Sequence, residues 1–295
     1  MSRAGLTARD LFRDPSGALR PPWRLVIFGG ATALAMVIIN GAVVPLISWA
    51  FALAGVRVVL YPWALLASAI VAHLLTFRWV DPRGWQSVRL GARALDARRI
   101  AWATVLGAAG VGVPVLVLLA LGWLRAEPGP PGSSLLAALA IGLFLAPAAL
   151  WEELMFRGYA FTALEEWWGT TAALIVTSLT FGLVHFTNAG ASPAAVGVVV
   201  LAGVMLGGVL IVTRSLYAAF AAHLAWNWTL AGLAHSAVSG IPFATPDYRV
   251  VDAGPDWATG GVWGPEGGAG AALGLLGTTI YLYARRERRG ERSHD

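Results

Sequence analysis

The chain lacks cysteine and lysine altogether, and charged residues of either sign are scarce. Without cysteine there can be no disulfide, no thiolate metal ligand and no thiol nucleophile. Charged residues make up 13% of the 295 residues, whereas a typical soluble domain carries about a quarter. Hydrophobic residues make up 57%, and the mean hydropathy is +0.67. These values exclude an ordinary soluble domain and predict an integral membrane protein.

Long apolar segments are frequent. A membrane-spanning helix needs about 20 mostly apolar residues. Candidate spans are residues 25–53, 60–79, 100–124, 134–160, 170–188, 194–213, 216–234 and 268–284. Pro45 lies inside the first segment, so a kink or an early end of the helix is expected there. The predicted fold is all-α, a polytopic membrane helical bundle with about eight transmembrane helices.

The basic residues are all arginine, and they lie at the ends of the apolar segments. They form no stripe with aromatic residues, so no nucleic-acid partner is expected. With a cytoplasmic N-terminus, 17 of the 21 arginines fall on the inner side of the eight spans. Only Arg57, Arg125 and Arg249 fall on the outer side. This asymmetry predicts a multi-pass protein of the cell (plasma) membrane with both termini cytoplasmic.

One membrane domain, residues 25–284, is predicted between two cytoplasmic basic tails, residues 1–24 and 285–295. A cleaved signal peptide is disfavoured because the first apolar run is too long. The segment 235–267 is rich in glycine and proline, so an irregular outer cap is expected there. Gly203 and Gly207 form a G-x-x-x-G pattern that favours close helix packing.

Ionisable residues inside a bilayer are expensive and indicate a functional site. The polar residues of interest within the spans are Glu152, Glu153 and Arg157 in the fourth, His185 in the fifth, and His223 and Asn227 in the seventh.

Helix geometry relates several of these residues. Glu153 and Arg157 are four residues apart, so they share a helix face and can form an ion pair. Glu152 points about 100° away from Glu153 and is free to face another neighbour. Glu152 and His185 lie at nearly equal distances from the turn expected near Gly169. An antiparallel hairpin would therefore bring these two residues to similar depth.

The chemistry open to this group is limited. A carboxylate with imidazoles suits the activation of water, with Glu152 as general base and His185 holding the water or carrying its proton. His223 and Asn227 could then donate hydrogen bonds to the oxyanion. Alternatively, Glu152, His185 and His223 could ligate a divalent metal such as zinc. The residues are compatible with either arrangement, so the cofactor is none or a divalent metal.

Three motifs in order carry a resemblance to a known family. They read Glu152-Glu153-x-x-x-Arg157, Phe181-x-x-x-His185 and His223-x-x-x-Asn227. This pattern, over about residues 134–234, resembles the CPBP family. The family includes the type II CAAX prenyl endopeptidases and the bacteriocin-processing or immunity (Abi) proteins.

The resemblance implies an intramembrane endopeptidase with a polar cavity that opens within the bilayer. By this analogy Glu152 and His185 activate water, and His223 and Asn227 form the oxyanion site. Glu153 and Arg157 then support the site. Both a metalloprotease and a metal-free glutamate mechanism are associated with the family. The expected partners are a peptide or protein substrate at the membrane and the lipid bilayer itself.

The alternative function is a non-catalytic membrane scaffold or immunity protein, or a small transporter that uses the same polar cavity. A transporter of this kind is expected to show paired repeats with broken helices. The sequence contains no such repeat, and no motif residue is missing as in a pseudo-enzyme. Both observations favour the enzyme.

The depth of the site has two interpretations. The arginine distribution places the turn at Gly169 on the inner side. Glu152 and His185 then lie about 25 Å from this turn at about 1.5 Å per residue, nearer the outer leaflet. If residues 159–168 instead lie along the inner interface, the site moves closer to the cytoplasm. Both placements are compatible with the sequence.

Overall fold

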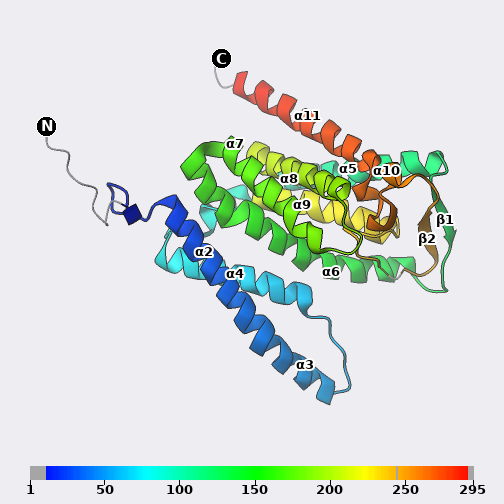
Figure 1. Ribbon diagram of the computed structural model, residues 1–295, viewed down its shortest axis with the longest axis horizontal. Helices are drawn as coiled ribbons and strands as arrows, with labels where there is room; N and C mark the ends of the chain where they lie inside the picture. Colours follow the sequence, from blue (N-terminus) through cyan, green and yellow to red (C-terminus); the bar gives the residue numbers. More distant parts are fainter. Residues whose placement is uncertain (1–10, 244, 292–295) are drawn as a thin grey trace.

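The computed structural model describes residues 11–243 and 245–291, and helices dominate it (Figure 1). The ends of the predicted basic tails, residues 1–10 and 292–295, lie outside the described residues. The long helices are α2 Pro21–Ile38, α3 Val44–Leu53, α4 Tyr61–Trp79, α5 Ala97–Ala120, α6 Ser134–Glu153, α7 Tyr159–Val184, α8 Pro193–Thr213, α9 Leu216–Trp228 and α11 Ala269–Glu291.

The predicted all-α membrane class fits this architecture, but the count of about eight spans is not confirmed. In the described residues, the helical stretches long and apolar enough to cross a membrane are Pro21–Leu53, Ala97–Ala120, Ser134–Thr187 and Pro193–Thr213. The third is 54 residues long and includes a break at Gly169, with φ +82° and ψ 169°. The predicted spans in α4 and α9 carry polar residues such as His73 and His223, which lower their hydropathy.

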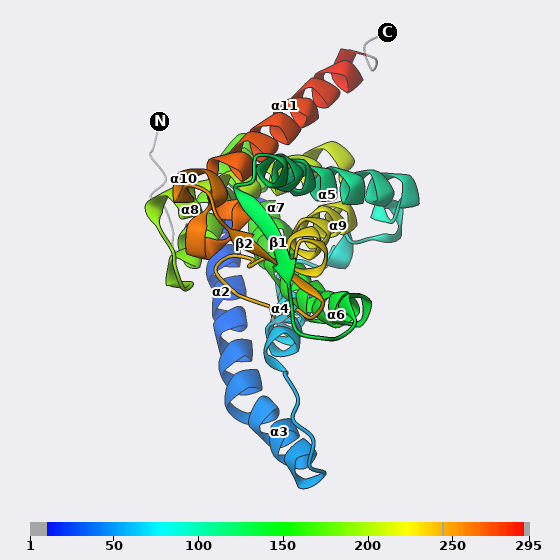
Figure 2. The ribbon, with the colours of Figure 1, turned by 90° about the vertical axis from the view of Figure 1, so that its right-hand side faces the viewer.

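The first long helix does not end early. A π-helical turn, η1 (Ile39–Val43), joins α2 to α3, and Pro45 lies just after it. Proline has no backbone N–H to donate within a helix. A π-helical turn changes the backbone hydrogen-bond pattern and therefore suits the position just before Pro45. Helix α3 and the loop to α4 project away from the bundle (Figures 1 and 2), and no residue of α3 is buried.

Close helix packing in the bundle depends on glycine. Helix α9 packs against α5, α6 and α8. A Cβ atom at Gly107 of α5 would lie 2.1 Å from the carbonyl oxygen of Ala222 in α9. At Gly203 of α8, a Cβ atom would lie 2.9 Å from Cα of Ser178 in α7. The close packing predicted from the G-x-x-x-G pattern is therefore confirmed at Gly203.

The cap is more regular than expected. Strands β1 (Leu124–Pro128) and β2 (Tyr248–Asp252) form an antiparallel pair in which Ala126 faces Val250. The short helix α10 (Asp256–Thr259) and further 3₁₀ turns follow β2. The expected irregular cap therefore contains a strand, because Tyr248, Val250 and Val251 are good strand residues that find a distant partner after α5.

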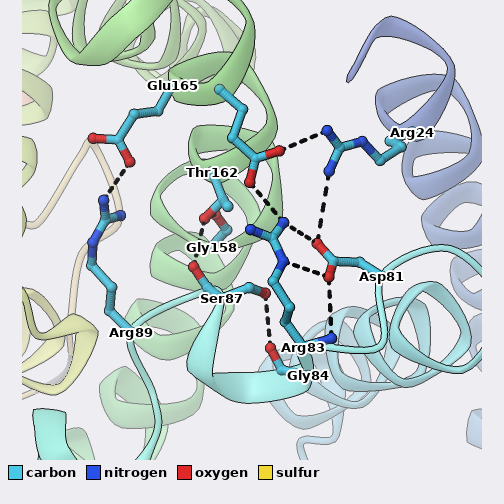
Figure 3. A network of polar contacts seen from close by, with 10 residues as sticks. Arg24, Asp81, Arg83, Gly84, Ser87, Arg89, Gly158, Thr162 and Glu165 are labelled. Atoms are coloured by element: carbon cyan, nitrogen blue, oxygen red, sulfur yellow. Dashed lines mark hydrogen bonds and ion pairs between the residues drawn. The ribbon is translucent and has the colours of Figure 1, made fainter. Parts of the chain in front are cut away.

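A network of ion pairs joins the start of α2 to the loop after α4 and to α7 (Figure 3). Glu166 of α7 forms ion pairs with Arg24 and Arg83, each at 2.6 Å. Arg83 also binds Asp81, whose side chain is buried. Burial alone would raise the pKa of Asp81, but hydrogen bonds and charge from Arg83 hold that pKa below its ordinary value. The network thereby fixes three segments that are distant in sequence.

Residues 159–168 form a helical segment of their own between two backbone breaks. Gly158 has a non-helical ψ of −124°, and Gly169 is the second break. Within the segment, Glu165 pairs with Arg89, and Thr162 donates to the Ser87 carbonyl (Figure 3). These contacts join the segment to the arginine-rich loop predicted to be cytoplasmic.

Candidate functional site

A small cavity lies where α6, α7, α8 and α9 meet the cap, and its volume is about 100 Å³. Glu152, His185, His223 and Asn227 all line it. The rest of the wall is mainly apolar, with side chains such as Phe144 from α6. Four polar residues from three stretches of the chain therefore share one space.

The predicted ion pair between Glu153 and Arg157 is present. Nη1 of Arg157 lies 2.9 Å from Oε1 of Glu153, and neither side chain is exposed. Nη2 of Arg157 donates to the Gly203 carbonyl at 3.2 Å, and the guanidinium lies 4.3 Å from the Phe181 ring centroid. Glu153 and Arg157 thus lie behind the cavity wall and join α6 to α7 and α8.

His223 bridges the two glutamates, a contact that the sequence did not predict. Its Nδ1 lies 2.8 Å from Oε1 of Glu153, and its Nε2 lies 3.5 Å from Oε2 of Glu152. An ionised carboxylate only accepts hydrogen bonds, so Nδ1 carries a proton directed at Glu153. Glu153 therefore orients the imidazole, and Nε2 is directed toward Glu152 in the cavity wall.

His185 is held by the backbone of its own helix. It begins the 3₁₀ turn η5 (His185–Thr187) at the end of α7, and its Nδ1 lies 2.7 Å from the Phe181 carbonyl oxygen. Because a carbonyl only accepts, Nδ1 is the protonated nitrogen. In the neutral ring, Nε2 then has a lone pair available to accept a hydrogen bond.

A kink directly follows the glutamate pair. The π-helical turn η4 (Leu154–Gly158) ends α6, and the N–H of Tyr159 donates to Nε2 of His73 at 3.3 Å. A Cβ atom at Gly158 would lie 2.7 Å from the same nitrogen. His73 of α4 therefore satisfies a backbone donor at the kink, and Gly158 gives it room. Such π-helical turns are frequent at functional sites.

The cap contributes residues that the sequence analysis missed. Ser239 and Glu266 line the cavity beside Asn188, and Glu266 is only 7% exposed. The one signal for Glu266 was an acidic residue two positions before the predicted span 268–284. No spacing related it to the motifs, because it reaches the site through the folding of the cap.

The geometry does not fit a metal centre. In the described part of the chain, no group of three or more histidine, cysteine and acidic side chains could hold a metal ion. Glu152, His185 and His223 share the cavity without forming such a group. We therefore derive no step through a metal.

Comparison with known proteins gives one match. Residues 131–229 match a family described as type II CAAX prenyl endopeptidase Rce1-like. This range contains all the motif residues, from Glu152 to Asn227, and confirms the resemblance inferred from the motifs. No curated protein and no solved structure matches the chain.

Proposed function

Because residues 131–229 form an Rce1-like domain, we propose that this protein is an intramembrane endopeptidase that hydrolyses peptide bonds of membrane-associated substrates. The observation that carries the proposal is the shared cavity. There a carboxylate, two imidazoles and an amide, from Glu152, His185, His223 and Asn227, lie among apolar side chains. This set can activate water and stabilise an oxyanion without a covalent intermediate on the protein.

Glu152 is the general base in this proposal. Its carboxylate and the unprotonated Nε2 of His185 hold a water molecule in the cavity. Glu152 takes a proton from this water while the water oxygen forms a bond to the carbonyl carbon of the substrate. General-base catalysis of this kind contributes about 10²- to 10⁴-fold to a rate.

His223 carries the proton onward. Its Nε2 lies 3.5 Å from Glu152, so the proton can pass to it, and Glu153 stabilises the resulting imidazolium. Asn227 and the protonated Nε2 of His223 donate hydrogen bonds to the oxyanion. When the carbon–nitrogen bond breaks, the proton moves to the amide nitrogen. The products are a carboxylic acid and an amine.

We propose further that the protein lies in the cell membrane with both termini in the cytoplasm. This orientation rests on the arginine distribution and on the loop after α4. There Arg83 and Arg89 pair with glutamates of residues 159–168. The cavity lies at the other end of α7, beside the cap. By the family resemblance, substrates are expected to reach the site from within the membrane.

The test is cleavage of a library of membrane-anchored peptides by the full-length protein in nanodiscs. Wild type, Glu152→Gln and the control Glu127→Gln are compared, each with and without a chelator. Glu127 lies on β1, and its side chain is 46% exposed. We expect wild type and the control to cleave, and kcat of Glu152→Gln to fall by about 10²- to 10⁴-fold.

Equal cleavage by wild type and Glu152→Gln would refute the role of Glu152. Failure of the wild type on every peptide would refute the endopeptidase and favour the scaffold. The chelator distinguishes a metal-dependent from a metal-free reaction.

A further inference from the structure

The outer wall of the cavity includes a tight turn of the cap. Val238 and Ile241 form an isolated antiparallel bridge, with backbone hydrogen bonds in both directions. The two residues between them, Ser239 and Gly240, have φ of +49° and +76°. Positive φ at both central residues is the geometry of a type I′ turn, which is compact and well defined. A Cβ atom at Gly240 would lie 2.1 Å from the Ala189 carbonyl oxygen, so the turn packs closely on the loop that follows η5.

Glu266 holds this turn against α9. Its Oε1 accepts from the backbone N–H and the hydroxyl of Ser239, the latter at 2.7 Å. Its Oε2 accepts from the indole Nε1 of Trp226 at 3.1 Å. Within residues 11–243 and 245–291, no ion pair of Glu266 is found. A buried carboxylate needs such donors, so these hydrogen bonds strongly fix its position.

The contacts of Glu266 continue to the other side of the cavity. The side-chain amide of Asn188 donates to the Ser239 carbonyl at 3.0 Å. Asn188 follows His185 by three residues, and Trp226 directly precedes Asn227. A hydrogen-bonded relay, Asn188–Ser239–Glu266–Trp226, therefore joins the segment that carries His185 to the segment that carries Asn227.

Helix geometry alone does not set the separation between these two site residues, because they lie on different helices. His185 begins a 3₁₀ turn, and Asn227 stands just before the π-helical turn η6 (Thr229–Leu233). Among the described residues, no hydrogen bond joins His185 to Asn227 directly, so their separation depends on groups that connect the two helix ends.

We propose that Glu266 is a positioning residue of this site. It holds His185 and Asn227 at their working separation through Trp226 and Ser239, and it does not touch the reacting atoms. This inference rests on the proposed function. Because a displacement of about 1 Å in a catalytic arrangement can lower a rate about 100-fold, loss of the relay should act on kcat.

The experiment is a double-mutant cycle in the full-length protein in nanodiscs. Glu266→Gln keeps an acceptor for Ser239 but turns an amide N–H₂ toward the indole N–H of Trp226. Asn188→Leu removes the hydrogen bond to the Ser239 carbonyl and keeps a side chain of similar volume. We expect each variant to lower kcat about tenfold, with KM changed less than about twofold. The double variant should be no slower than the slower single variant, because one relay is already broken. Glu127→Gln is the matched control.

A second measurement does not depend on activity. Hydrogen exchange is followed at the amides of Gly240, bonded to the Trp263 carbonyl, and of Asn188, bonded to the His185 carbonyl. In Glu266→Gln both should exchange at least about tenfold faster than in wild type, while amides in the centre of α9 stay unchanged.

Unchanged exchange at these amides would overturn the proposal. Effects on kcat that multiply in the double variant would also overturn it. A change in KM alone would overturn it as well, because it would indicate that Glu266 contacts substrate. If wild type cleaves no peptide, the endopeptidase fails. Faster exchange at both amides would then still support the relay, and unchanged exchange would overturn it.

Discussion

Replacement of Arg157 by methionine tests the buried ion pair behind the site. Methionine keeps an unbranched apolar side chain but removes the guanidinium. Arg157 and Glu153 are both 0% exposed, so the substitution leaves a buried carboxylate without its arginine. The hydrogen bond to the Gly203 carbonyl and the contact with Phe181 are lost as well.

The magnitude follows from this geometry. Removing one partner of a fully buried ion pair costs about 3–5 kcal/mol, because the remaining charge is desolvated and uncompensated. His223 still contacts Glu153, but it also faces Glu152. The double variant Arg157→Met/Glu153→Gln removes the stranded charge and should recover at least about 2 kcal/mol.

The assay is equilibrium unfolding of wild type and both variants in mixed micelles, titrated with a denaturing detergent. If Arg157→Met is within about 1 kcal/mol of wild type, the pair is effectively solvated and the description of a desolvated ion pair is wrong. A double variant less stable than the single variant would show that the loss comes from packing.

Three further predictions concern positions outside the reacting groups. Gly107→Ala should lower the free energy of unfolding by about 1–3 kcal/mol, measured as above, because its Cβ would stand 2.1 Å from the Ala222 carbonyl oxygen. Gly158→Ala should lower the free energy of unfolding by about as much. If the clash with the His73 imidazole is the cause, adding His73→Ala should restore part of this stability, and no recovery would exclude the clash. The lowered pKa of Asp81 means that its charge stabilises the fold above the ordinary value of 3.8, and that this contribution is lost as pH falls through the lowered pKa. The difference in melting temperature between wild type and Asp81→Asn should therefore shrink only below about pH 4, and a constant difference from pH 7 to pH 2 would contradict this.

Much of the site could be predicted from local rules. The i, i+4 spacing of Glu153 and Arg157 is enough for their ion pair, and Glu152 and His185, which were predicted to lie at similar depth, line one cavity. Both inferences use only the rise and period of a helix, which the sequence determines once the apolar segments are located.

The rest depends on packing between distant segments. The contact of His223 with Glu153 requires the rotation of α9 against α6, which no spacing specifies. Glu266 and Ser239 reach the cavity through the folding of the cap, which no spacing in the sequence relates to the motifs. The span count differs partly because two predicted spans, 134–160 and 170–188, lie in one continuous helical stretch, Ser134–Thr187.

The projecting first helix has a consequence for the membrane around the protein. Pro21–Leu53 comprises 33 residues, or about 50 Å of helix, whereas the hydrocarbon layer of a bilayer is about 30 Å thick. Tilts of membrane helices rarely exceed about 40°, so tilt alone does not absorb the excess length, and the lipid must thicken locally or the helix must bend at η1. Helix α2 packs on α4, and His73 of α4 contacts the kink after Glu152. We therefore expect the acyl-chain length of the surrounding lipid to affect the geometry of the site.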